Sequence, residues 1–188
     1  MKKLIVTFLC AILLFASNIP FAVSVDASTR IADIKTNSTK DTAAKWAVNK
    51  GVIKLASNNR FNKTKLLTER ELLAAFAKLD RNYVYSTSNY DMMYNHYSEL
   101  HIPLKGALDR AKRNSAVTRG EFAVIYAAMF GLDLSEKQAV RYLYLNEITT
   151  GTTKSKTYES YNPTNKLTRG DAAVFLYRMN AKKKNLRV

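Results

Sequence analysis

Three apolar segments of similar length recur along the chain, and the same short motif opens each of them. The segments span residues 72–77, 122–127 and 172–177. Each motif runs apolar–Thr–x–x–acid, and the chain numbers of its three threonines differ by 50. A period of this size is typical of repeat proteins, in which neighbouring units bury apolar faces that no unit can bury alone. The pattern therefore predicts three tandem units of about 50 residues that fold together.

Each unit is expected to contain two helices. In the first unit, residues 42–50 place alanines and Trp46 on one helical face, and Gly51 follows as a stop residue. A second helix is predicted over residues 69–80, directly after the motif. The other predicted helices cover residues 90–100, 104–113 and 135–147 and the segment after the third motif, and residues 152–160 are expected to be a polar loop. The expected fold class is all-α, mostly helical, with short extended segments in the loops.

The N-terminal segment has the composition of a secretory signal peptide. A basic start precedes an apolar stretch over residues 4–16, which is too short to cross a membrane. Cleavage is expected after Ala27, with Ser24 as a second candidate, and the alternative is a retained N-terminal anchor. Cys10 lies inside the apolar stretch, so the mature chain would contain no cysteine. The predicted organisation is a signal peptide (1–27), three units (28–82, 83–132 and 133–181, the second degenerate) and a basic tail (182–188).

Composition and charge narrow the function. The hydrophobic content of 47% and the charged content of 24% are ordinary for a folded soluble domain. The net charge of +15 falls only to +14 when the signal peptide is removed. So large an excess of positive charge implies an anionic partner. Because the chain carries an export signal, an acidic polysaccharide is a better candidate than nucleic acid.

The threonine and the acid of each motif predict helix capping. A threonine hydroxyl at the N-cap accepts from a free first-turn amide, and a carboxylate three residues later bonds back to the N-cap amide. The predicted caps pair Thr68 with Glu71, Thr118 with Glu121 and Thr168 with Asp171. This is a capping box, strictly so for the two units with glutamate and with a shorter arm at Asp171.

The residues between threonine and acid suggest a ligand site. Arg119 and Arg169 place a cation beside the positive end of a helix dipole, a position that costs about 0.3–1 kcal/mol on an exposed helix. Gly120 and Gly170 follow and would leave first-turn amides uncovered. An arginine next to bare amides forms an anion cradle that suits a carboxylate or a phosphate. The structural alternative is that the acids offset the arginines and glycine relieves crowding.

These motifs resemble the S-layer homology domain family of bacterial surface proteins. The resemblance rests on residues 46–53, on Tyr161-Asn162-Pro163 and on residues 167–173. It implies three tandem units packed as a pseudo-threefold helical body that binds secondary cell-wall polysaccharide bearing pyruvate ketals. The family's carbohydrate-contacting arginine corresponds to Arg119 and Arg169.

The first unit departs from this motif. Glu69 occupies the arginine position, and Arg70 comes one residue later, turned by about 100° on a regular helix. The candidate ligand-binding residues are therefore Arg119, Arg169, Gly120, Gly170 and Trp46, together with the displaced Arg70.

Catalysis and metal binding are not expected. The two histidines, His96 and His101, are poorly spaced for one helical face. Asp91, Glu99 and Asp109 are scattered carboxylates with no nucleophile or orienting partner. A tyrosine cluster is expected to pack between units, although it could also stack on sugars. Its members are Tyr83, Tyr85, Tyr90, Tyr94 and Tyr97.

The sequence thus predicts a secreted, non-catalytic protein at the cell wall of a Gram-positive-type bacterium. Its expected partner is an acidic cell-wall polysaccharide, with no cofactor, no metal, no nucleic acid and no stable membrane insertion. The alternative is a charge-driven binder of another anionic polymer, or an adaptor to a surface protein.

Overall fold

The structure is a computed structural model that describes residues 31–153 and 155–182. Over these residues the chain is mostly helical and strand pairing is limited to three isolated bridges, which confirms the all-α class. The elements are α1 (Thr39–Asn49), α2 (Glu69–Leu79), α3 (Tyr90–Glu99), α4 (Lys105–Leu108), the 3-10 helix η1 (Arg110–Asn114), α5 (Arg119–Ala128), α6 (Glu136–Leu145), α7 (Tyr158–Tyr161) and α8 (Arg169–Ala181). The predicted signal peptide and residues 183–188 of the tail lie outside the described residues.

The threonine of each motif caps the helix that follows it. At α5, the Thr118 hydroxyl accepts from the Glu121 amide at 3.0 Å, and the Glu121 carboxylate accepts from the Thr118 amide at 2.8 Å. The same reciprocal pair is present at α2. At α8 the shorter Asp171 side chain accepts instead from the Thr168 hydroxyl at 2.7 Å. A cap of this kind stabilises a helix by about 1 kcal/mol.

The residues before the three threonines join the motifs in a closed cycle of backbone hydrogen bonds. The Leu67 amide donates to the Leu167 carbonyl at 2.9 Å, and the Leu167 amide donates to the Val117 carbonyl at 2.8 Å. The Val117 amide completes the cycle by donating to the Leu67 carbonyl at 3.0 Å. All three side chains are buried. Each motif therefore depends on the other two for its backbone pairing.

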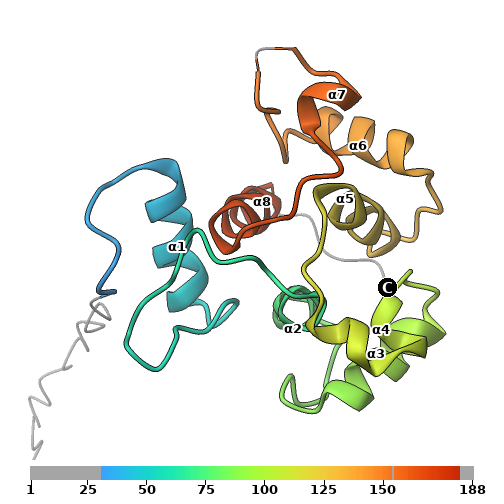
Figure 1. Cartoon of the computed structure of the whole chain (residues 1–188). Helices are drawn as coiled ribbons and strands as arrows, with labels where there is room; N and C mark the ends of the chain where they lie inside the picture. The colour runs from blue at the N-terminus through green and yellow to red at the C-terminus, as the bar shows by residue number, and fades with distance from the viewer. Residues whose placement is uncertain (1–30, 154, 183–188) are drawn as a thin grey trace, which may run out of the picture.

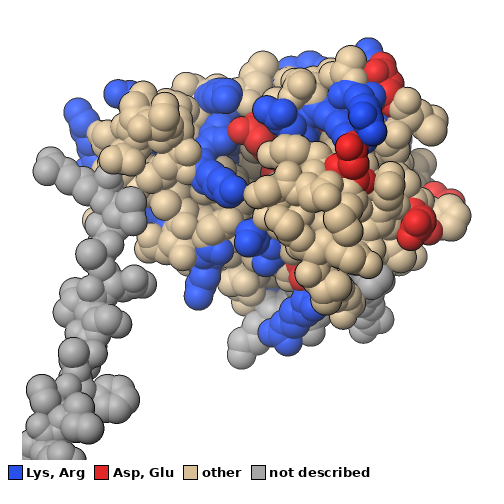
Figure 2. Space-filling view, turned by 90° about the horizontal axis from the view of Figure 1, so that it is seen from below, with Lys and Arg blue, Asp and Glu red and all other residues tan. Residues whose placement is uncertain are grey.

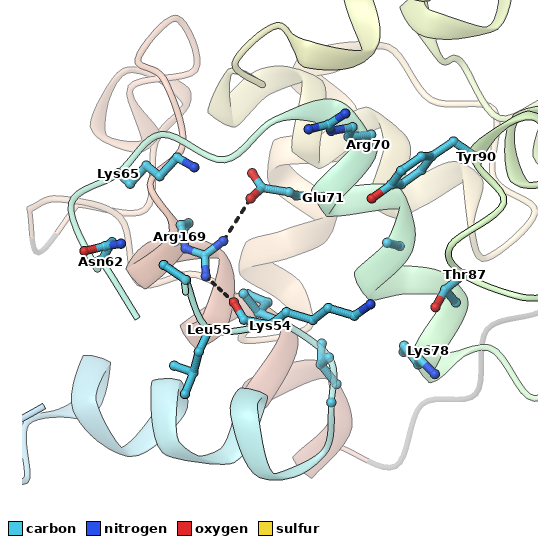
Figure 3. Close-up of a pocket in the computed structure, with 15 residues that line it drawn as sticks. Lys54, Leu55, Asn62, Lys65, Arg70, Glu71, Lys78, Thr87, Tyr90 and Arg169 are labelled. Atoms are coloured by element: carbon cyan, nitrogen blue, oxygen red, sulfur yellow. Dashed lines mark hydrogen bonds and ion pairs between the residues drawn. The ribbon is translucent and has the colours of Figure 1, made fainter. Parts of the chain in front are cut away.

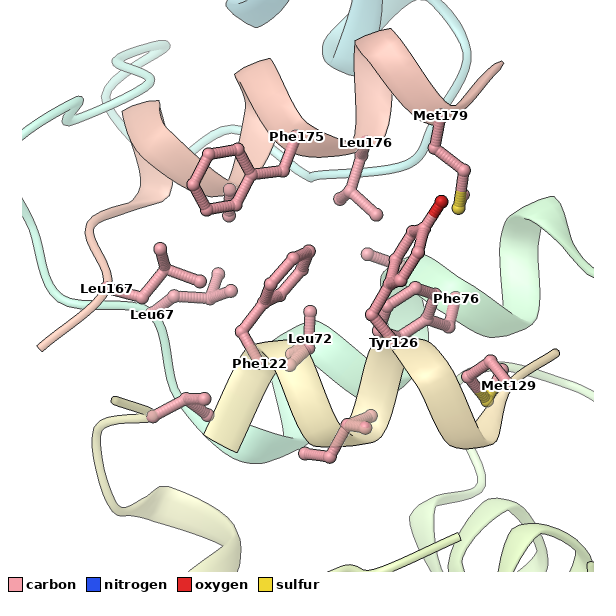
Figure 4. Packing of buried hydrophobic residues seen from close by; sticks show 14 of the residues in the cluster. Leu67, Leu72, Phe76, Phe122, Tyr126, Met129, Leu167, Phe175, Leu176 and Met179 are labelled. Carbon is pink, nitrogen blue, oxygen red and sulfur yellow. The ribbon is translucent and has the colours of Figure 1, made fainter. Parts of the chain in front are cut away.

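The three helices that follow the motifs surround the core. Figure 1 shows α2, α5 and α8 at the centre of the molecule, and Figure 4 shows their apolar side chains meeting. Phe122 lies between the other two helices, with its ring 6.0 Å from Phe76 and 5.0 Å from Phe175 between centroids. These rings carry much of the apolar burial that stabilises the fold.

The remaining helices pack on the outside of this central group. Helix α1 packs on α8, α3 on α2 and α6 on α5, so each outer helix lies against the central helix of another unit (Figure 1). The chain ends of the described region are thereby tied together, since α1 and α8 belong to the first and third units. The pseudo-threefold packing of whole units stays a prediction, because the outer segments differ in their elements.

Two segments differ from the secondary structure that the sequence predicts. Residues 104–113 form α4 and η1 rather than one helix, and the chain is extended at Asp109, whose side chain accepts from an amide two residues later. The expected loop over residues 152–160 contains the start of α7, which Thr157 caps. Both elements depend on short side-chain-to-backbone hydrogen bonds, which apolar periodicity does not reveal.

Candidate functional site

A basic cavity lies where the first and third units meet, and Tyr90 of the second unit also lines it. It forms where the loop after α1 and the exposed face of α2 meet Arg169 of α8, and its volume is about 220 Å³ (Figure 3). Its charged lining residues are Lys54, Lys65, Arg70, Lys78, Arg169 and Glu71, and its other lining residues include Val52, Ile53, Leu55 and Tyr90. Five basic side chains thus face one carboxylate among the described lining residues.

Arg169 is a fixed part of the cavity wall. It is 5% exposed, and its guanidinium lies 5.1 Å from the centroid of the Phe61 ring. Its Nε donates to the Phe61 carbonyl at 2.8 Å and its Nη2 to the Lys54 carbonyl at 2.6 Å. Its Nη1 donates to Glu71 Oε1 at 2.9 Å (Figure 3). Each of its three nitrogens therefore already has a protein acceptor.

Arg70 lines the same cavity. The sequence placed it one residue after the motif position, and the structure directs it to the cavity that Arg169 also lines. Its guanidinium lies 5.4 Å from the centroid of the Tyr90 ring, close enough for a cation–π contact (Figure 3). The displaced arginine therefore adds a second guanidinium to the cavity between units three and one.

Three lysines that the sequence analysis did not single out complete the basic lining. Lys54 follows α1, Lys65 precedes the first motif and Lys78 lies in the last turn of α2, and all three are exposed. Within the described part of the chain, none of them has an ion pair. The repeat could have revealed Lys78, because Arg178 lies two repeat lengths later, at the equivalent position, and is also basic. Arg178 lines another cavity.

Arg119 lies at a second cavity of about 320 Å³, which residues of all three units line. It is 9% exposed, its Nε donates to the Tyr161 carbonyl at 2.7 Å, and its guanidinium lies 4.6 Å from the centroid of the Tyr161 ring. Lys40 and Arg178 also line this cavity, where Lys40 pairs with Asp171 at 2.8 Å. Burial would raise the pKa of Asp171, but hydrogen bonds from Lys40 and from the cap threonine and the charges of Lys40 and Arg119 bring it below its ordinary value.

The first unit presents an acid where the other units present arginine. Glu69 is 5% exposed and accepts from the Lys105 amide at 2.9 Å, the Gly106 amide at 2.7 Å and the Tyr94 hydroxyl at 2.9 Å. Burial and the Glu69 charge raise the pKa of Tyr94. Glu69 also lines a third cavity, of about 300 Å³, in which Lys105 pairs with Glu121. The Glu69 carboxylate therefore accepts from the first amides of α4, at the contact between the first and second units.

The anion cradle expected at the two glycines is not present. The Gly120 amide donates to the Pro163 carbonyl at 2.8 Å, and the Gly170 amide donates to the Lys63 carbonyl at 2.9 Å. A Cβ atom at Gly170 would lie only 3.0 Å from that same carbonyl oxygen. Both amides are occupied because the loop of the next unit crosses the helix start. Gly170 permits this close approach, as the crowding alternative proposed, whereas a Cβ atom at Gly120 would meet the Glu136 side chain instead.

Trp46 and most of the tyrosine cluster lie in packing interfaces. The Trp46 ring is 5.6 Å from the Tyr177 ring between α1 and α8, and Trp46 does not line the basic cavity. Tyr83 stacks on Tyr97 at 5.5 Å, and the Tyr97 hydroxyl donates to Asp80 at 3.1 Å. Of the five tyrosines, only Tyr90 lines the basic cavity.

Among the described residues, no three His, Cys, Asp or Glu side chains are close enough together to hold a metal ion. No helix within residues 31–153 and 155–182 is both long and apolar enough to span a membrane. No protein-family model matches the chain. A search of curated proteins finds no significant match.

Proposed function

We propose that this chain is a secreted, non-catalytic protein that binds an acidic polysaccharide of the cell wall of a Gram-positive-type bacterium. The basic cavity is the observation that carries the proposal, since its described lining has five basic side chains and one carboxylate, and that carboxylate is paired with Arg169. An anionic polymer would neutralise the unpaired cations without requiring any reaction.

Three further features support a polysaccharide. The cavity combines charge with an aromatic ring and apolar residues, a mixture that suits a sugar ring bearing an acidic group. The three repeated motifs resemble those of S-layer homology domains. Figure 2 shows basic side chains over much of one face of the molecule, where acidic side chains are fewer, so a long polymer could lie over this part of the surface.

Co-sedimentation with purified wall sacculi tests the proposal. We expect the protein to pellet with intact sacculi and to stay in the supernatant after chemical removal of the secondary polysaccharide. Equal pelleting with both preparations would contradict wall-polysaccharide binding. An enzyme would instead release soluble fragments from the sacculi.

A second candidate is binding of anionic polymers by charge alone, which the net charge of +15 favours. Such binding weakens steeply with salt and shows no preference among polyanions. Competition separates the two hypotheses. Purified wall polysaccharide should displace the protein from sacculi at a constant salt concentration, whereas an unrelated polyanion of equal charge should not.

A further inference from the structure

The dimensions of the basic cavity limit what can enter it. Its volume of about 220 Å³ is below the roughly 300–1,000 Å³ of sites for drug-sized ligands. One sugar residue with its charged substituent suits this space, while the rest of a polymer would run over the surface outside. The inference below concerns the chemical class of that charged substituent, and it rests on the proposed binding of a polysaccharide.

Most N–H donors of Arg169 are already used by the protein. A guanidinium recognises a carboxylate through two parallel N–H donors. Three of the five Arg169 N–H groups, one on each nitrogen, already donate to oxygens of the protein at distances of 2.6–2.9 Å, so only one N–H on each Nη is left for a ligand. Arg169 therefore contributes a buried positive charge from the cavity wall, while its pairing with Glu71 neutralises the only carboxylate among the described lining residues.

The unpaired positive charge comes from several directions. Lys54 and Lys65 project from loops on either side of Phe61, and Arg70 and Lys78 project from the two ends of α2. Figure 3 shows Lys54 and Lys78 on the side of the cavity where Tyr90 lies. Four unpaired cations are more than one carboxylate needs, and lysines bind as point charges without the planar match that a carboxylate favours.

We propose that the basic cavity binds a phosphate monoester on a sugar residue of the wall polymer, in preference to a carboxylate. A phosphate monoester carries a charge of about −1.5 to −2 at pH 7 on three acceptor oxygens. Those oxygens can contact cations on different sides of the cavity at once. Tyr90 and the apolar residues Val52 and Leu55 are then left to contact the sugar ring.

Binding of small probes by calorimetry tests this assignment. Glucose 6-phosphate and glycerol 3-phosphate represent the phosphate on a sugar and on a simple alcohol, and glucuronate represents the carboxylate. At equal ionic strength and pH 7.5, we expect a phosphate ester to bind about tenfold more tightly than glucuronate. Tighter binding by glucose 6-phosphate than by glycerol 3-phosphate would assign the phosphate to a sugar.

The pH dependence gives an independent measurement. The second pKa of a phosphate monoester is about 6, so affinity should rise about tenfold between pH 5 and pH 7.5 as the dianion forms. The charged groups that face the cavity are lysines, arginines and the paired Glu71, with no histidine among the described lining residues. Glucuronate is fully ionised over this range, so its affinity should stay constant.

A matched pair of double variants locates the site. Arg70→Ala with Lys54→Ala removes two cavity cations that have no hydrogen-bonded side-chain partner in the described part of the chain. Arg141→Ala with Lys137→Ala removes the same charge from exposed positions of α6. We expect the first variant to lose at least about tenfold in affinity for glucose 6-phosphate and the second less than about twofold. Unchanged circular dichroism would show that both variants are folded.

The outcomes separate this inference from the proposed function. Equal or tighter binding of glucuronate overturns the phosphate assignment, even if the protein still sediments with sacculi. Equal losses in the two double variants also overturn it, because they would show that net charge rather than the cavity binds the probes. Loss of the difference between intact and stripped sacculi overturns the proposed function itself.

Discussion

At the scale of single residues, the exchange of Glu69 and Arg70 changes two sites at once. In the motif order Thr–Arg, the arginine faces the loop of the next unit, as Arg119 and Arg169 do. In the first unit, Glu69 takes that position and binds two backbone amides, while Arg70 lines the basic cavity. Glu69 therefore binds amides of the second unit at the contact between the first two units, and the basic cavity has two arginines, Arg70 and Arg169.

Replacement of Glu69 by Ala should destabilise the protein without removing a cation from the basic cavity. The change leaves two amides and the Tyr94 hydroxyl without their acceptor in a buried place. We expect the free energy of unfolding to fall by about 3 kcal/mol in urea denaturation. Glu99→Ala, at an exposed position of α3, should change it by less than about 0.5 kcal/mol. A Glu69→Ala protein as stable as this control would show that the carboxylate is not a structural acceptor.

The glycine that follows the motif arginine of the third unit also has a structural reason. Gly170 lets the Lys63 carbonyl approach the start of α8, where it accepts from the Gly170 amide. The sequence showed that glycine stood there twice. It could not show that another loop would occupy the amides, because that loop is distant in the chain.

At the scale of elements, local hydrogen bonds define the helix starts and distant side chains hold the helices in place. The first turn of α1 contains Asp41, which is fully buried and accepts from the Lys63 ammonium and the Thr36 hydroxyl. Hydrogen bonds from Lys63 and Thr36, the largest contributions, lower the pKa of Asp41 from 3.8 to about 2. This carboxylate links α1 to the loop that leads into the first motif.

The Asp41→Asn variant should lose stability in a pH-dependent way. Because the folded-state pKa lies below the unfolded value, the carboxylate stabilises the fold above pH 4 and loses this effect as the pH falls toward 2. We expect the variant to be about 1–2 kcal/mol less stable at pH 7 by urea denaturation, and the gap to narrow between pH 4 and pH 2. Asp133→Asn, at an exposed loop position, serves as the control. A gap of constant size across that range would assign the loss to packing rather than to charge.

At the scale of the whole molecule, the three motifs close on one another. The bonds among Leu67, Val117 and Leu167 form a cycle, and α1 of the first unit packs on α8 of the third. Removal of any one unit would therefore break two of the three bonds in the cycle and leave both other units without one of their neighbours. The basic cavity is itself a product of this closure, since Arg169 enters it from the far end of the described chain.

Removal of the third unit, residues 133–188, should therefore abolish cooperative folding of the rest. Leu67 would lose its acceptor, α1 would lose the helix it packs on, and the Phe122 ring would lose Phe175. We expect thermal unfolding followed by circular dichroism to show no cooperative transition in the truncated chain. Removal of residues 183–188 alone should preserve the transition. A sharp transition in the longer truncation would show that the units fold independently.

Much of this architecture could be predicted from the sequence. Helix caps and apolar faces depend on residues three or four positions apart, so the motif at Thr118 and the segment after it sufficed to predict the start of α5. The same local logic predicted the cap at Thr168, where Asp171 bonds the threonine hydroxyl. The all-α class followed because these local signals recur three times.

The basic cavity could not be predicted in this way, because its parts have no common local signal. Lys54 and Arg70 come from one unit and Arg169 from another, and only the closure of the cycle brings them together. The occupation of the Gly170 amide is likewise a contact between units. The sequence by itself determined the repeat, the helices and the excess of positive charge. Only the tertiary structure decided which cations share a cavity, because burial and charge proximity depend on distance in space rather than along the chain.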